Sequence, residues 1–167
     1  AWGLGGQLML ASRKVQLEGL KPEIDQITEF LQLHQVKDIY VHDFFAENPD
    51  KPESNRKRYA ILGSCFSTRH CWKVAIELKN AFNLNSAKTK LRRKQKYDPI
   101  YAILNGGKDE EWSMVEYKDY EISLMTEEQR EAMDLEWKWN IPTTEEVIDK
   151  HIEMKQRKGR KRQFEDL

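Results

Sequence analysis

The sequence predicts an α/β protein with one mixed β-sheet of about five strands, covered by helices in two or three layers and extended at both ends. Two observations lead to this prediction. Segments with helical apolar spacing alternate with short β-rich segments, and a strand–helix–strand passage precedes a predicted hairpin. The passage predicts parallel neighbours and the hairpin antiparallel ones, so the sheet is mixed. At 167 residues the chain has room for a single core.

The first part of the chain predicts an extension, a helix and a strand. Residues 1–20 contain four glycines and no sustained apolar period, so we interpret them as an extension. Apolar residues then recur on one helical face, which predicts a helix over Pro22–Gln35. Asp38–Phe45 alternates and is rich in β-forming residues, which predicts a strand, and Ala46–Arg56 is a loop.

The middle of the chain predicts a buried strand and a helix. Tyr59–Ser64 is short and apolar, which is typical of a strand buried on both faces. Ser67 or Thr68 can cap a helix that ends within Asn83–Ser86. Its predicted buried face consists of Trp72, Ala75, Ile76, Leu78 and Phe82.

A third set of elements follows a basic segment. Asp98–Leu104 is a predicted strand, and Asn105–Gly107 is a predicted turn. Trp112–Tyr117 and Tyr120–Met125 alternate around Lys118-Asp119, which predicts an antiparallel hairpin. These three segments are therefore the last three strands of the predicted sheet.

Two helices are expected after the hairpin. Thr126 can cap the first, which carries acids in its first turn and continues to Trp137 or Trp139. Pro142 interrupts the chain, and a second helix is expected over Thr144–Arg157. A basic tail follows it.

Charge is strongly segregated although the chain is neutral as a whole. Residues 54–96 contain twelve Lys or Arg and one acid, whereas residues 109–136 contain eleven acids and two bases. Such segregation predicts separate positive and negative surfaces that orient the molecule on a charged partner. The basic segment contains our candidates for contacts with nucleic-acid phosphates: Lys88, Lys90, Arg92, Arg93, Lys94 and Lys96.

No pattern of catalytic or metal-binding residues stands out. Cys65 and Cys71 lie near one histidine, too few ligands for a closed zinc site, so we expect buried free thiols in a reducing compartment. No apolar run is long enough to cross a membrane. Ser67 and His70 offer a hydroxyl and an imidazole, but a helix cap is the simpler interpretation. We expect neither enzymatic activity nor a cofactor.

The tryptophans favour a binding function. Trp112, Trp137 and Trp139 all lie in the acidic third of the chain, and tryptophan is common at the energetic centres of interfaces. Packing beneath the last helix is an equally plausible role for each of them. Trp137 and Trp139 are two residues apart on a predicted helix, so at least one should be available to a partner or to the C-terminal extension.

The chain resembles the ribosomal silencing factor (Iojap) family from about Pro22 to Asn140. Glu111–Trp139 follows the family's acid and tryptophan, hairpin, and helix closing with Leu-Glu-x-x-Trp, and Lys57–His70 resembles its strand followed by Ser-Thr-Arg-His. Asp38–Phe44 matches the preceding strand. Four positions depart from the family pattern: Arg58 replaces Asp, Cys65 replaces Gly, Ser123 replaces His and Met133 replaces Tyr.

The resemblance implies a nucleotidyltransferase-like fold without the transferase site, in agreement with a missing pair of metal-binding carboxylates. It implies three regions: an N-terminal extension (1–20), the family domain (21–140), and a helical, basic C-terminal extension (141–167). It also implies docking on the large ribosomal subunit through the universal large-subunit protein numbered fourteen. The docking contacts are then expected from Trp112, Met125, Arg130, Leu135 and Trp139.

The extensions and the long loop Ala46–Arg56 exceed the compact bacterial form, which favours a mitochondrial member acting in the matrix. The resemblance then implies a role in late large-subunit assembly, steric block of small-subunit joining, and recruitment of a small LYR-motif protein with acyl carrier protein. A residual nucleotidyltransferase and a plain ribosomal RNA-binding protein are the alternatives.

Overall fold

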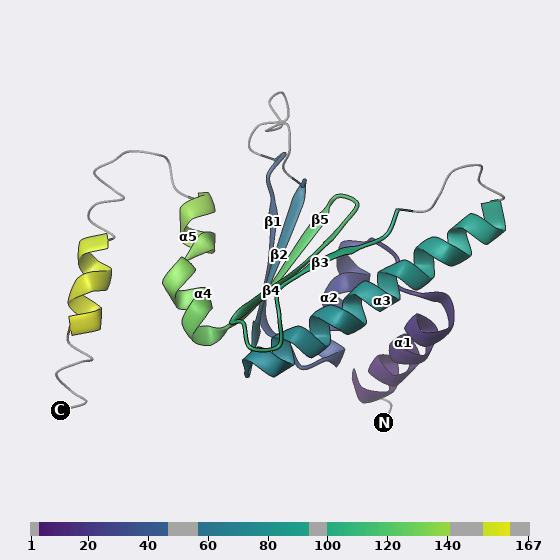
Figure 1. Cartoon of the computed structure of the whole chain (residues 1–167), viewed down its shortest axis with the longest axis horizontal. Helices are drawn as coiled ribbons and strands as arrows, with labels where there is room; N and C mark the ends of the chain where they lie inside the picture. Colours follow the sequence, from purple (N-terminus) through teal and green to yellow (C-terminus); the bar gives the residue numbers. More distant parts are fainter. Residues whose placement is uncertain (1–3, 47–56, 94–99, 141–151, 161–167) are drawn as a thin grey trace. The chain divides into compact units, whose positions relative to one another are not determined.

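A computed structural model of the chain describes residues 4–46, 57–93, 100–140 and 152–160 (Figure 1). The chain divides into two compact units, residues 1–133 and 134–167, which we describe separately. The first unit contains the whole β-sheet and the helices α1 to α4.

The first unit is built on a five-stranded sheet in the order β1-β2-β5-β4-β3. Only the central pair, β2 and β5, is parallel, and every other pair is antiparallel. The predicted mixed α/β architecture is therefore confirmed. The strands are β1 (Lys37–Asp43), β2 (Tyr59–Cys65), β3 (Ile103–Asn105), β4 (Trp112–Tyr117) and β5 (Tyr120–Thr126).

Three helices lie on one face of this sheet (Figure 1). They are α1 (Leu4–Glu18), α2 (Ile24–Leu33) and α3 (Thr68–Arg93). The core between helices and sheet includes Leu31, Leu78, Phe82, Ile61 and Ile122, all fully buried. Burial of each such aliphatic or aromatic side chain contributes about 1.5–3 kcal/mol. β2 is buried along nearly its whole length, as its apolar sequence predicted.

The N-terminal segment, which we interpreted as an extension without predicting an element, forms a regular helix. α1 packs against α2 and α3 with Val15 on its inner side, while Leu10 and Leu17 are exposed on its outer side. Apolar residues on both sides of a helix cancel the single-stripe period that identifies amphipathic helices. The sequence pattern was therefore uninformative there.

The helix α3 continues to Arg93, beyond its predicted end at Asn83–Ser86. The polar residues that suggested a helix end bind the returning chain instead. The Asn83 side-chain oxygen accepts a hydrogen bond from the Ala102 N–H (2.8 Å), and the Ser86 hydroxyl donates to the Ile100 carbonyl (2.7 Å) and contacts the Tyr117 hydroxyl. The predicted buried face is only partly buried, because Trp72 and Ile76 are half-buried.

The strand predicted at Asp98–Leu104 is shorter and shifted, since β3 covers three residues and includes Asn105. Residues 94–99 lie outside the described part of the chain. Gly106 follows with φ +130°, and a Cβ there would lie 2.7 Å from the Ser113 hydroxyl oxygen. Only glycine fits this approach between the turn and β4.

The helix after the hairpin is interrupted. Thr126 caps α4 (Glu127–Met133) as predicted, because its hydroxyl accepts a hydrogen bond from the Gln129 N–H (3.3 Å). Asp134 then adopts φ +46° and ends the helix, so the continuous helix predicted to Trp137 or Trp139 was wrong.

The second unit contains α5 (Leu135–Asn140) and a helical segment at residues 152–160. An ion pair joins Lys155 to Asp134 at 3.2 Å. Most of the helix predicted over Thr144–Arg157 falls on residues 141–151, outside the described residues.

Candidate docking surface

The face of the sheet opposite α1–α3 carries the candidate surface. Strand register brings alternate residues together on this face. One row runs Ala60, Glu121, Glu116 and Ile103 from β2 to β3, and the next runs Leu62, Ser123, Met114 and Asn105. Trp112 lies directly opposite Met125 in the row after that.

The central part of this face is closed. Leu62, Ser123 and Met125 are at most 2% exposed. Met125 was expected to contact a partner, but its side chain is fully buried and therefore supports the sheet. Met125 pairs with Ser64 of β2, and α4 packs against β2 and β5 on this part of the face, which explains the burial.

The part of the face formed by β4 and β3 is accessible. Trp112, Met114 and Glu116 are half-buried, and Ile103 is 56% exposed. We call these four residues the β4–β3 surface. The indole N–H of Trp112 is buried and meets no acceptor within the described part of the chain. A partly exposed tryptophan beside aliphatic side chains is a typical centre of an interface.

Acidic residues border the β4–β3 surface. Glu116 lies directly opposite Glu121 in the β4–β5 pair, an arrangement that destabilises a sheet when both side chains are charged. Asp109, Glu110 and Glu111 are exposed in the turn that leads into β4. The surface therefore combines an apolar centre with a negative border.

The remaining predicted contact residues lie in α4 and α5. Arg130 is half-buried, and its guanidinium donates a hydrogen bond to the Ser64 hydroxyl at 2.8 Å, which ties α4 to β2. Leu135 and Trp139 belong to the second unit, and both are half-buried there, as is Trp137. Partner contacts by Arg130, Leu135 and Trp139 stay a prediction.

The basic candidates lie at the end of α3. Lys88 and Lys90 are half-buried on the helix, and Arg92 and Arg93 form its last residues. Lys94 and Lys96 lie outside the described residues. RNA contact by these six residues stays a prediction.

Comparison with known proteins identifies the family. The family described as "Ribosomal silencing factor during starvation" matches residues 20–166. The chain belongs to the ribosomal silencing factor family. No curated protein matches it well enough to be counted as a relative. Among solved structures, Protein CV0518 from Chromobacterium violaceum matches with 19% identity and a TM-score of 0.47, covering 73% of this chain and 90% of that one.

The Ser-Thr-Arg-His motif of this silencing factor is structural. The Ser67 hydroxyl accepts a hydrogen bond from the His70 N–H (3.1 Å), which confirms the predicted helix cap. His70 Nδ1 accepts from the Phe66 N–H (3.0 Å), so Nε2 carries the proton and donates to the His34 carbonyl (2.7 Å). Backbone groups thus occupy both ring nitrogens, and the imidazole is not placed to act as a base for Ser67.

His34, which accepts the hydrogen bond from His70, makes a further contact beside it. His34 Nδ1 lies 2.9 Å from a Glu77 carboxylate oxygen, which joins α2 to α3. Burial lowers the pKa of His34, and the attraction to Glu77 only partly opposes this shift.

The described residues contain no group of three or more His, Cys, Asp or Glu side chains that could hold a metal ion. Within the same residues, no helix has the length and apolarity to cross a bilayer.

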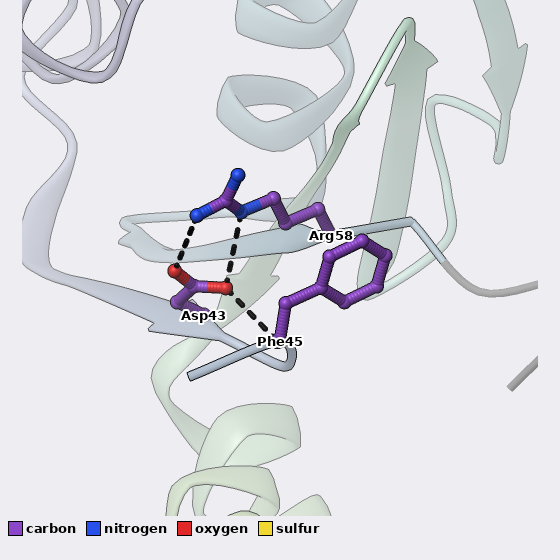
Figure 2. A network of polar contacts seen from close by, with 3 residues as sticks. All are labelled: Asp43, Phe45 and Arg58. Atoms are coloured by element: carbon purple, nitrogen blue, oxygen red, sulfur yellow. Dashed lines mark hydrogen bonds and ion pairs between the residues drawn. The ribbon is translucent and has the colours of Figure 1, made fainter. Parts of the chain in front are cut away.

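Two departures from the silencing factor pattern have local partners. Arg58 donates to both carboxylate oxygens of Asp43 (3.3 and 3.4 Å) and lies over the Phe45 ring (Figure 2). It also lies over the Tyr59 ring. Cys65 is a buried free thiol, as predicted, and so is Cys71. A hydrogen bond with Cys71, together with burial, raises the pKa of Cys65, so this thiol stays protonated.

Sequence reasoning missed three members of the β4–β3 surface. Met114 and Glu116 alternate with Trp112 along one strand, so a period of two already placed them on the same face. Ile103 could be added only from the register, which pairs it with Glu116.

Proposed function

We propose that this silencing factor acts without catalysis, by docking its β4–β3 surface on a basic protein surface of the large ribosomal subunit. Once docked, it blocks joining of the small subunit sterically. The observation that carries the proposal is the accessible Trp112 inside an acidic border, because it combines an apolar anchor with charge that selects a basic partner.

We further propose a mitochondrial setting. The factor would act in the matrix during late large-subunit assembly, with the universal large-subunit protein fourteen as the basic partner. A small LYR-motif protein with acyl carrier protein would join it there. The long segment at residues 46–56, the N-terminal segment before the family match and the family resemblance support this finer assignment.

Co-sedimentation with purified mitochondrial subunits tests the docking proposal. We expect the full chain to sediment with large subunits but not with small ones. Trp112→Ala should weaken this binding by about 2 kcal/mol or more, as truncation of a central interface residue does. Glu116→Lys should weaken it as well, because it reverses the charge that faces the basic partner.

Tyr101→Ala provides the matched control, since Tyr101 is an aromatic residue that is 53% exposed outside the β4–β3 surface. It should bind like the natural protein. Equal binding to both subunits, or a chain that stays at the top of the gradient at low salt, would refute the proposal.

Direct contact with ribosomal RNA is a second candidate function. It is favoured by Lys88 and Lys90, which lie within one turn near the end of α3 beside the predicted phosphate contacts. Such contacts would add salt-sensitive affinity that is largely independent of RNA sequence.

A further inference from the structure

The outer side of α1 exposes large apolar side chains. Met9 is 77% exposed, Leu10 70% and Leu17 59%. Val15, by contrast, packs against the core formed by α2 and α3. Leu10 and Leu17 are seven residues apart and therefore share one helical face, whereas Val15 lies on the other side. α1 thus has one apolar face that is covered and another that is open.

The helix is held in place at its C-terminal end. The Leu20 N–H donates to the Ala81 carbonyl of α3 (2.9 Å), and the Leu20 side chain is buried. Gly19 adopts φ +83°, and a Cβ at this position would lie 2.3 Å from the Asn85 backbone nitrogen. This close backbone approach fixes α1 on α3, so its outer face is presented by an anchored element.

Charge restricts what can cover this face. Arg13 lies between Leu10 and Leu17 on the same face, Lys14 lies beside it, and both are exposed. The one acidic side chain of α1 is that of Glu18, the last residue of the helix, which is exposed. A second copy of the helix packed face to face would bring like charges together, whereas a helix bordered by acids would pair with them.

We propose that the outer face of α1 is a docking surface for an amphipathic helix of a second protein, one whose apolar stripe is bordered by Glu or Asp. This surface lies on the helical side of the sheet, away from the β4–β3 surface. The two surfaces can therefore be occupied together, and the proposal does not depend on ribosome binding.

A synthetic peptide pair tests the proposal. Both peptides are amphipathic helices of about four heptads with Leu on the apolar stripe, bordered by Glu in one and by Lys in the other. In fluorescence anisotropy with the full chain, we expect the Glu-bordered peptide to bind about tenfold or more tightly than the Lys-bordered one. The double variant Leu10→Glu/Leu17→Glu should lose this binding.

Charge reversal gives the sharper result. Arg13→Glu/Lys14→Glu should invert the preference, so that the Lys-bordered peptide binds better. Leu91→Glu is the control, because Leu91 is 79% exposed on α3 and lies on a different element. It should leave peptide binding unchanged, and circular dichroism should show that all variants remain folded.

Several outcomes would overturn the proposal. They are equal binding of both peptides, binding that survives Leu10→Glu/Leu17→Glu, binding to anionic phospholipid vesicles in place of the peptides, and a chain dimer that this double variant disrupts. Co-sedimentation of the same variant with large subunits separates the two proposals. The variant should sediment with large subunits as the natural protein does, because it leaves the β4–β3 surface unchanged.

Discussion

At the residue scale, Arg58 shows how a side chain that departs from the family pattern can be accommodated. It binds both oxygens of Asp43 at the end of β1 (Figure 2) and lies over the rings of Phe45 and Tyr59. The hydrogen bond from Arg58 lowers the pKa of the Asp43 carboxyl below its ordinary value of 3.8. The native state therefore holds the ionised carboxylate more strongly than the unfolded chain does.

The sign of this shift gives a pH prediction. A carboxyl whose pKa is lowered on folding stabilises the protein above its unfolded pKa, and this contribution disappears as pH falls through the folded pKa. We expect Arg58→Ala to lower the urea midpoint at neutral pH by a small amount, because the pair is exposed. The difference from the natural protein should shrink below pH 3.8.

Asp43→Asn is the matching variant and should show the same pH dependence. If Arg58→Ala lowers the urea midpoint equally at neutral and at acidic pH, the ion pair is not the main source of stability. Packing of Arg58 on Phe45 and Tyr59 would then be the larger contribution.

At the element scale, local patterns predicted most strands and helices but failed where distant partners decide the outcome. The hairpin and the Thr126 cap were predictable because their signals lie within a few residues. The continuation of α3 was not, since Asn83 and Ser86 bind a chain segment that returns 19 and 14 residues later. The burial of Met125 was not predictable either, because it depends on the packing of α4 against β5 and β2.

Gly19 gives the prediction at this scale. Gly19→Ala would force a side chain into a left-handed backbone conformation and against the Asn85 backbone, at a cost of about 1–3 kcal/mol from backbone strain alone. We expect α1 to detach locally, with amide exchange over residues 4–18 faster by about tenfold or more.

Gly107→Ala provides the control, because a Cβ there would meet only the Glu110 side chain at ordinary contact distances. It should leave exchange in α1 unchanged. Unchanged exchange in Gly19→Ala would show that this contact does not anchor the helix.

At the scale of the whole molecule, positive and negative charges are segregated, which a net charge of zero does not reveal. The sequence located both charged regions, and the register added the two glutamates that face one another on the sheet. The position of the β4–β3 surface could not be predicted as a whole, because it needs Ile103, whose place beside Glu116 depends on the register between β3 and β4.

Salt dependence tests the contribution of the basic region. We expect Lys88→Glu/Lys90→Glu to weaken large-subunit binding partially and to reduce its salt sensitivity, because fewer phosphate contacts release fewer counterions. Trp112→Ala should weaken binding more and leave the salt dependence nearly unchanged. Complete loss of binding in the lysine variant would instead favour a plain RNA-binding protein. Co-sedimentation across a salt series measures both effects.

The facing pair Glu116 and Glu121 has a consequence for the free protein. An accessible sheet face with exposed aliphatic side chains invites a second copy to stack on it, and such stacking leads to aggregation. Here each copy would bring its own carboxylates against those of the other, so self-association is opposed. We expect these carboxylates to keep the free protein dispersed, in addition to the role that we propose for them in selecting a basic partner.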